Sequence, residues 1–201
     1  MATKYEKVKQ DFLSGRLKGC KSFFIQNGYN LEAGYCCLIL DKLDLAKEFF
    51  EKEKDNNIRA HWGLFLLQLI KGDIKSYPTY FEIRNFLELD IDILITYCKG
   101  EYVEKIANYA DFMAHYNPEC YKFLGRVLWA NNLMPASMFF LQRAWDTFYQ
   151  DPELHYMLAY IYYHNNKDIV ACRKALDACL NMLPEYAPAK KLSSKINNLR
   201  Y

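Results

Sequence analysis

The sequence predicts an all-α fold, and more narrowly an α-solenoid of antiparallel helix pairs, on three observations. Apolar residues recur at spacings of three and four along the 201-residue chain, and alternating strand patterns are absent. Turn-forming residues divide the chain into segments of helix length. Residue types return 34 positions later at several sites, which is typical of stacked helical repeats. We therefore expect about five helix pairs in a single repeat domain, residues 1–201.

The charge balance argues against partners that are bound by charge alone. Lysine and arginine total 26 against 24 aspartates and glutamates, and the net charge of +2 gives no basis for binding nucleic acid or an anionic membrane. The first ten residues lack the apolar core of a secretory signal, and the longest apolar stretch, residues 63–70, is too short to span a membrane. We expect an intracellular, cytoplasmic protein with reduced cysteines.

Turns and helix starts can be placed in order. Turn signals lie at residues 27–28, 55–57, 71–73, 99–100, 131–132 and 165–167. Pro118 and Pro152 follow Asn117 and Asp151, which are capping residue types, and a proline loses no hydrogen bond in the first turn of a helix. Short turns between helices of about 12–15 residues favour antiparallel packing of neighbours.

The internal period is clearest in the C-terminal half. Matching positions are Pro118 with Pro152, Ala110 with Ala144 and Ala178, Leu124 with Leu158, Gly125 with Ala159, and Ser137 with Ala171. Small residues suit the point where the two helices of a hairpin cross, because a bulky side chain would hold the backbones apart. We expect Gly125 and Ala159 on first helices to lie opposite Ser137 and Ala171 on second helices.

With these residues the chain resembles the tetratricopeptide repeat (TPR) family. That pattern places Leu, Gly and Tyr on the first helix and Ala, Phe and Ala on the second. The last unit matches through Leu158, Ala159, Tyr162, Ala171, Ala175 and Ala178, followed by Pro184. Further matches are Leu124, Gly125, Leu128, Ser137, Leu141 and Ala144, and, near the N-terminus, Gly34, Ala46 and Phe50. The resemblance covers residues 90–184 and 30–54, whereas the middle, with Trp62, Gly63 and Pro78, departs from the pattern.

The resemblance implies a right-handed superhelix with its best-defined repeats at residues 84–117, 118–151 and 152–185. Residues 186–201 carry Leu192, Ile196 and Leu199 on one stripe, and we expect them to form a helix that caps the last repeat. In stacked helix pairs the first helices line a concave surface that suits a peptide or a helix.

The sequence does not indicate an enzyme. The four histidines are not at metal-binding spacing, and no HExxH, GxSxG or Walker-type sequence is present. Asp90 and Asp92 are two residues apart, so they point to different faces of a helix, and we expect solvated positions for both. We expect no catalytic residue, cofactor or metal.

One stripe of the first helices carries the candidate partner-binding residues. They are Lys122, Arg126 and Trp129, and, 34 residues on, Tyr156, Tyr160 and Tyr163. Tyrosine, tryptophan and arginine are the usual anchors of binding hot spots, so we expect a protein partner that offers an acidic or aromatic peptide or helix.

Three alternatives use the same residues. In the first, the cations only pair with Glu88 and Asp92, and the tyrosines stack on one another. In the second, the surface forms a homodimer or joins copies within a larger complex. In the third, it binds single-stranded RNA, against which the overall charge argues.

Overall fold

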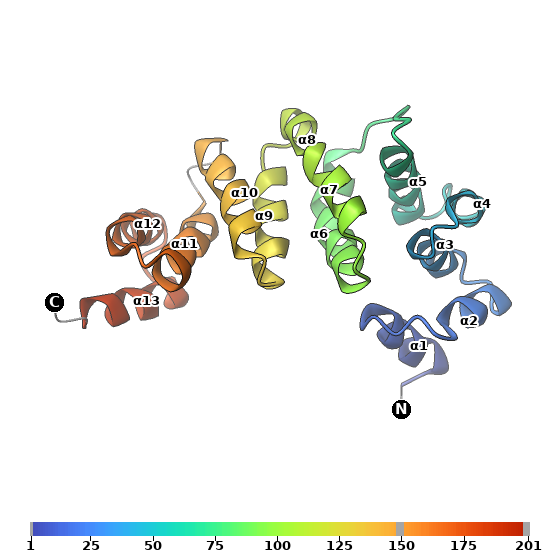
Figure 1. Cartoon of the computed structure of the whole chain (residues 1–201), viewed down its shortest axis with the longest axis horizontal. Coiled ribbons are helices and arrows are strands. Elements are labelled where there is room, and N and C mark those ends of the chain that lie inside the picture. The colour runs from blue at the N-terminus through green and yellow to red at the C-terminus, as the bar shows by residue number, and fades with distance from the viewer. Residues whose placement is uncertain (1, 148–150, 199–201) are drawn as a thin grey trace. The chain divides into compact units, whose positions relative to one another are not determined.

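The computed structural model describes residues 2–147 and 151–198, and within these residues it contains thirteen α-helices, one π-helix and no strand (Figure 1). The predicted all-α fold is therefore confirmed. Residues 148–150 of the predicted repeat 118–151, and residues 199–201 of the predicted capping helix, lie outside the described part. The chain divides into two compact units, Met1–Ala110 and Asp111–Tyr201.

The first unit is built from seven helices within its described residues. They are α1 (Lys4–Leu13), α2 (Cys20–Gln26), α3 (Asn30–Ile39), α4 (Leu43–Glu51), α5 (Ile58–Lys71), α6 (Tyr80–Thr96) and α7 (Gly100–Asn108). Helices α3 and α4 form a hairpin against which α5 packs, and α6 packs against α5 and α7. A capping box starts α6, because Thr79 Oγ1 accepts from the Glu82 N–H while the Glu82 carboxylate accepts from the Thr79 N–H.

The second unit contains two hairpins and a final helix. Its elements are α8 (Ala110–Tyr116), which begins at the boundary, α9 (Cys120–Ala130), α10 (Met134–Thr147), α11 (Pro152–Ile161), the π-helix η1 (Tyr162–Asn166), α12 (Ile169–Met182) and α13 (Ala187–Asn197). Helix α9 packs on α10, α11 packs on α12, and α13 contacts both α11 and α12 (Figure 1). The predicted start at Asp151 and Pro152 is confirmed, since Asp151 Oδ1 accepts from the Leu154 N–H at 3.0 Å.

Small residues lie where the helices of a hairpin cross, as expected. Gly125 on α9 is in direct contact with Leu141 on α10, and Ser137 Oγ donates to the Gly125 carbonyl at 2.7 Å. Gly34 on α3 meets Phe50 on α4 in the same way, at the same sequence spacing of 16. Two hairpins of the chain therefore use one local packing solution, in which a glycine makes room for a large side chain.

The middle of the chain departs from this solution for a physical reason. Gly63 on α5 lies against the ring of Phe50, which already fills the space beside Gly34. The glycine that suggested a new hairpin thus packs on the preceding one. At the hairpin spacing of 12 from Gly63 the chain has Lys75 and no small residue.

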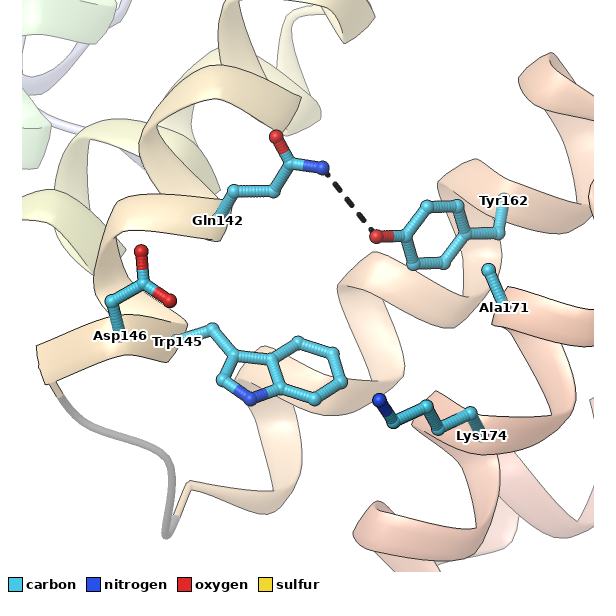
Figure 2. A pocket seen from close by; sticks show the side chains of 6 residues that line it. All are labelled: Gln142, Trp145, Asp146, Tyr162, Ala171 and Lys174. Atoms are coloured by element: carbon cyan, nitrogen blue, oxygen red, sulfur yellow. Dashed lines mark hydrogen bonds between the residues drawn. The ribbon is translucent and has the colours of Figure 1, made fainter.

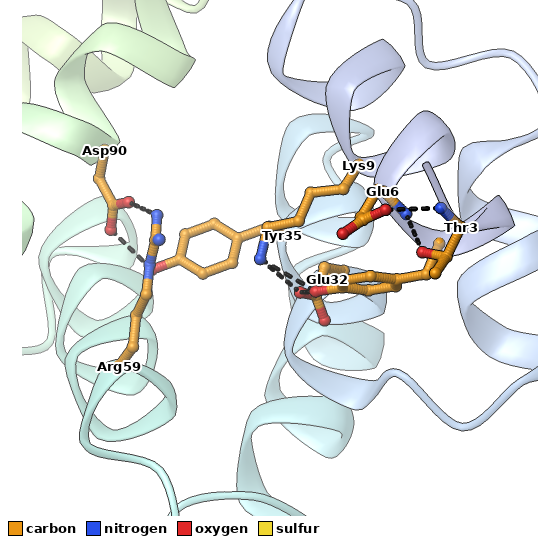
Figure 3. Close-up of polar contacts among 8 residues, drawn as sticks. Thr3, Glu6, Lys9, Glu32, Tyr35, Arg59 and Asp90 are labelled. Carbon is orange, nitrogen blue, oxygen red and sulfur yellow. Dashed lines mark hydrogen bonds and ion pairs between the residues drawn. The ribbon is translucent and has the colours of Figure 1, made fainter. Parts of the chain in front are cut away.

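The expectation that Asp90 is solvated was wrong. Its side chain is buried on α6 and accepts hydrogen bonds from Tyr35 Oη at 2.6 Å, Arg59 Nη2 at 2.6 Å and Trp62 Nε1 at 2.7 Å. Figure 3 shows Tyr35 and Arg59 converging on the carboxylate. The three donors satisfy both oxygens, which makes burial of the charge tolerable. Asp92, two residues on, is exposed as expected.

Candidate functional site

The structure brings the six predicted partner-binding residues together in the second unit. Lys122, Arg126 and Trp129 follow one stripe of α9, while Tyr156 and Tyr160 follow one stripe of α11, and Tyr163 lies in η1. The spacing of three and four residues puts each set on one face of its helix. Contacts between α9 and α11 then place the two stripes side by side.

Four rings form a continuous aromatic row, which we define as Trp129, Tyr160, Tyr156 and Tyr186. The centroids of Trp129 and Tyr160 are 5.5 Å apart, those of Tyr160 and Tyr156 6.4 Å, and those of Tyr156 and Tyr186 5.5 Å. Each pair meets edge to face, the arrangement that aromatic quadrupoles favour. All four side chains are half-buried, so the row is held in place and still presents ring surface to solvent.

The π-helix η1 extends this aromatic surface. It follows α11 directly and ends at Lys167, whose backbone is left-handed (φ 56°). Such segments are rare and occur often at functional sites. In this one the His164 ring lies 4.2 Å from that of Tyr160 and 4.7 Å from that of Tyr163. Tyr163 therefore has only an indirect connection to the row, through the His164 ring, which contacts both Tyr163 and Tyr160.

Sequence reasoning missed Tyr186 and His164 as members of this surface. Tyr186 precedes α13 and joins the row only because α13 folds back onto α11 and α12. A signal for His164 existed, since it follows Tyr160 at the helical spacing of four.

The two predicted cations are compensated within the second unit. Lys122 Nζ lies 2.5 Å from Asp151 Oδ2 and 3.0 Å from Glu153 Oε2, and Arg126 Nη1 lies 3.1 Å from the same Glu153 oxygen. The Lys122 side chain is only 13% exposed. Burial opposes its charge, but the bonds to Asp151 and Glu153 outweigh that effect and raise the pKa of Lys122. Lys122 and Arg126 thus join α9 to the start of α11.

The indole N–H of Trp129 is a candidate donor at one end of the row. Its Nε1 atom is buried, and no acceptor for it is present among the described residues. A buried donor without an acceptor costs free energy, and a partner could accept from this N–H only if the side chains that cover it moved.

A cleft opens beside the row, between α11, η1 and α13. Its volume is about 180 Å³, and its lining residues are Tyr156, Tyr160, His164, Pro188, Lys191, Leu192 and Lys195. We call it the α13 cleft. Partial burial and the nearby Lys167 and Lys195 hold the pKa of His164 below its usual value, so the ring is neutral at neutral pH.

A larger hollow of about 450 Å³ lies between α10, η1 and α12 (Figure 2). Gln142 Nε2 and Tyr162 Oη are 3.5 Å apart across it, and the Trp145 ring and the Lys174 side chain face each other along its lower edge. Asp146 adds a carboxylate to its rim, so the lining mixes both charges.

Within residues 2–147 and 151–198, no group of three or more histidine, cysteine or acidic side chains is placed to hold a metal ion. No helix in that part of the chain is both long and apolar enough to cross a bilayer. Comparisons with protein-family models, with curated proteins and with solved structures found no match to this chain.

Proposed function

We propose that this chain is an intracellular helical-repeat protein, an α-solenoid of the TPR type, that acts as a scaffold or adaptor and catalyses no reaction. Its recognition surface is the aromatic row with Lys122, Arg126 and Tyr163 beside it. The observation that carries the proposal is the row itself: four half-buried rings held edge to face on neighbouring helices. Rigid aromatic side chains supply contact area at a low entropic cost.

The repeat assignment rests on two hairpins that share one packing solution. Gly34 with Phe50, and Gly125 with Leu141, have the same spacing and the same close contact. The final helix α13 lies against α11 and α12, which suits a helix that covers the end of a stack. An α-solenoid accounts for both features.

The size of the row favours a peptide or a single helix as the partner. An aromatic side chain buries about 200 Å² when fully enclosed, so four half-buried rings offer at most about 400 Å². A standard stable interface needs roughly 800 Å² from each partner. A short segment that lies along the row matches the smaller area better than a second folded domain does.

The proposal is tested by photo-crosslinking in the native cell. We would place the photoreactive residue p-benzoylphenylalanine at position 160, and in a control at position 80. Tyr80 is an exposed aromatic residue of α6 and lies in the first unit. We expect one or a few proteins to cross-link from position 160 but not from position 80, and to be lost when Trp129→Ala is added.

Cross-links that are identical from both positions, or that persist in Trp129→Ala, would contradict the aromatic row as the site. Charge reversal at Lys122 is a poorer test, because it would set a third carboxylate against Asp151 and Glu153 and disturb the junction of α9 and α11. Helical circular dichroism of each variant shows whether the fold is kept.

A further inference from the structure

The α13 cleft differs in charge from the rest of the recognition surface. Lys191 and Lys195 lie one turn apart on α13 and are exposed. Neither has an ion-pair partner among the described residues, and the lining contains no carboxylate. The neighbouring Lys190, by contrast, is bound by Glu185 at 2.8 Å, and Lys122 is bound by Asp151 and Glu153. Positive charge is therefore left uncompensated at this cleft.

A second, independent feature of the cleft is its wall of tyrosines. Tyr156 and Tyr160 form one side, and their hydroxyl groups have no hydrogen-bond partner among the described residues. The side chain of Leu192, which is buried, supplies apolar surface. The cleft thus combines two lysine ammonium groups, two phenolic hydroxyls and an apolar side, which is the lining expected around an anionic group attached to a carbon chain.

The volume limits what can enter. About 180 Å³ is the size of one large side chain and far less than a cofactor requires. Nucleic acid would need a track of several phosphate contacts, whereas the sum of charges over the whole chain is only +2. One anionic side chain of a peptide fits both the volume and the charge.

We infer that the α13 cleft receives one anionic side chain, a carboxylate or a phosphate, of a peptide whose neighbouring residues lie along the aromatic row. The inference rests on the proposed function, and it adds the chemistry that selects the partner. Lys191 and Lys195 bind the anion, Tyr156 and Tyr160 donate to it, and Leu192 contacts its carbon chain.

The test uses synthetic peptide libraries that share degenerate flanks and differ at one fixed central position. The central residue is glutamate, phosphoserine, phosphotyrosine, glutamine or lysine. Each library is bound to the full chain, to Lys191→Gln/Lys195→Gln, and to the matched control Lys190→Gln/Lys174→Gln, which also removes two positive charges from the second unit but none from the cleft lining. Circular dichroism confirms that each variant is folded.

We expect the glutamate or phosphorylated libraries to be retained roughly tenfold more than the glutamine library, because hydrogen bonds to charged groups are the stronger ones. The excess should disappear in Lys191→Gln/Lys195→Gln and persist in the control variant. A higher retention of a phosphorylated library identifies phosphate as the preferred group, and equal retention identifies a carboxylate as sufficient.

Three results would overturn the inference, and they distinguish its failure from the failure of the proposed function. If peptide binding is lost in Trp129→Ala but shows no preference for an anion, the aromatic row is a binding site and the α13 cleft is not, because Trp129 lies in the row and not in the cleft lining. If Trp129→Ala weakens the binding of no library, the proposed function itself fails. Lysine-dependent binding to vesicles of phosphatidylserine, with none to peptides, would assign the cleft to lipid headgroups and also contradict the inference.

Discussion

At the scale of single residues, the packing of the second unit depends on Gly125. A Cβ atom at this position would lie 2.5 Å from Leu141 Cδ2 and 3.3 Å from the Leu141 backbone nitrogen. The leucine side chain can rotate away, but the backbone nitrogen cannot without moving α10. We expect Gly125→Ala to lower the free energy of unfolding by about 1–3 kcal/mol, the usual cost of overpacking a core.

The measurement is denaturant unfolding followed by circular dichroism, with Gly100→Ala as the control. Gly100 begins α7, and a Cβ atom there would meet nothing within 4 Å. Alanine favours helix over glycine, so this control should be neutral or stabilising by up to about 1 kcal/mol. Equal stability of Gly125→Ala and the wild type would show that α9 and α10 do not cross this closely.

Residue patterns predicted the candidate site only in part. Spacing alone placed Trp129 and Tyr160 on matching stripes, and in the structure their rings are in contact. Tyr186 could not be found this way, because it joins the row through the fold of α13 onto α11 and α12. The ion pairs of Lys122 could not be predicted from the sequence either. Asp151 and Glu153 follow Lys122 by some thirty residues, and only the fold of α9, α10 and α11 brings them to it.

At the scale of elements, the Asp90 carboxylate joins three helices of the first unit. Tyr35 comes from α3, Arg59 from α5, and Asp90 from α6. Asp90→Asn removes the charge that compensates Arg59, whose side chain is only 24% exposed. We expect a loss of about 3 kcal/mol in the free energy of unfolding, because one partner of a largely buried ion pair is left behind.

A surface ion pair of equal length provides the control for this prediction. Lys71 Nζ lies 2.6 Å from Asp44 Oδ1, the same distance as between Arg59 and Asp90, but Asp44 is 94% exposed. Asp44→Asn should change the unfolding midpoint little, since water already solvates both charges. If the two variants lose equal stability, burial does not explain the contribution of the Arg59–Asp90 pair to the free energy of unfolding.

Element boundaries were more predictable than element packing. Turns at residues 99–100 and 131–132, and the helix start at Pro152, follow from local chemistry, and the structure places helix ends there. The π-helix η1 was not predicted, because residues 162–166 carry no local signal that separates it from the end of an α-helix. The packing of Gly63 on Phe50 was missed for a related reason: periodicity describes faces of helices and does not say which face meets which.

At the scale of the whole molecule, the area of the aromatic row bears on whether it binds a peptide or a second copy of the chain. Both compact units have cores of their own, and the row and the α13 cleft belong to the second. A homodimer built on the row alone would bury at most about 400 Å² from each copy, half the area of a standard interface. Two such faces together fall in the range of weak, transient contacts and below that of stable dimers of folded chains.

We therefore expect a light-scattering mass of 23.8 kDa at micromolar concentration, unchanged in Tyr160→Ala. Twice that mass in the wild type, reduced to 23.8 kDa by Tyr160→Ala, would reassign the row to self-association. A doubled mass that Tyr160→Ala leaves intact would place a dimer contact elsewhere and keep the row available for a peptide.

Salt separates the remaining alternative, because binding of a single-stranded RNA through its phosphates would weaken steeply between 50 and 200 mM salt. A peptide held along the row, with one anionic side chain in the α13 cleft, would lose much less affinity over that range, since a single charge contact depends weakly on ionic strength.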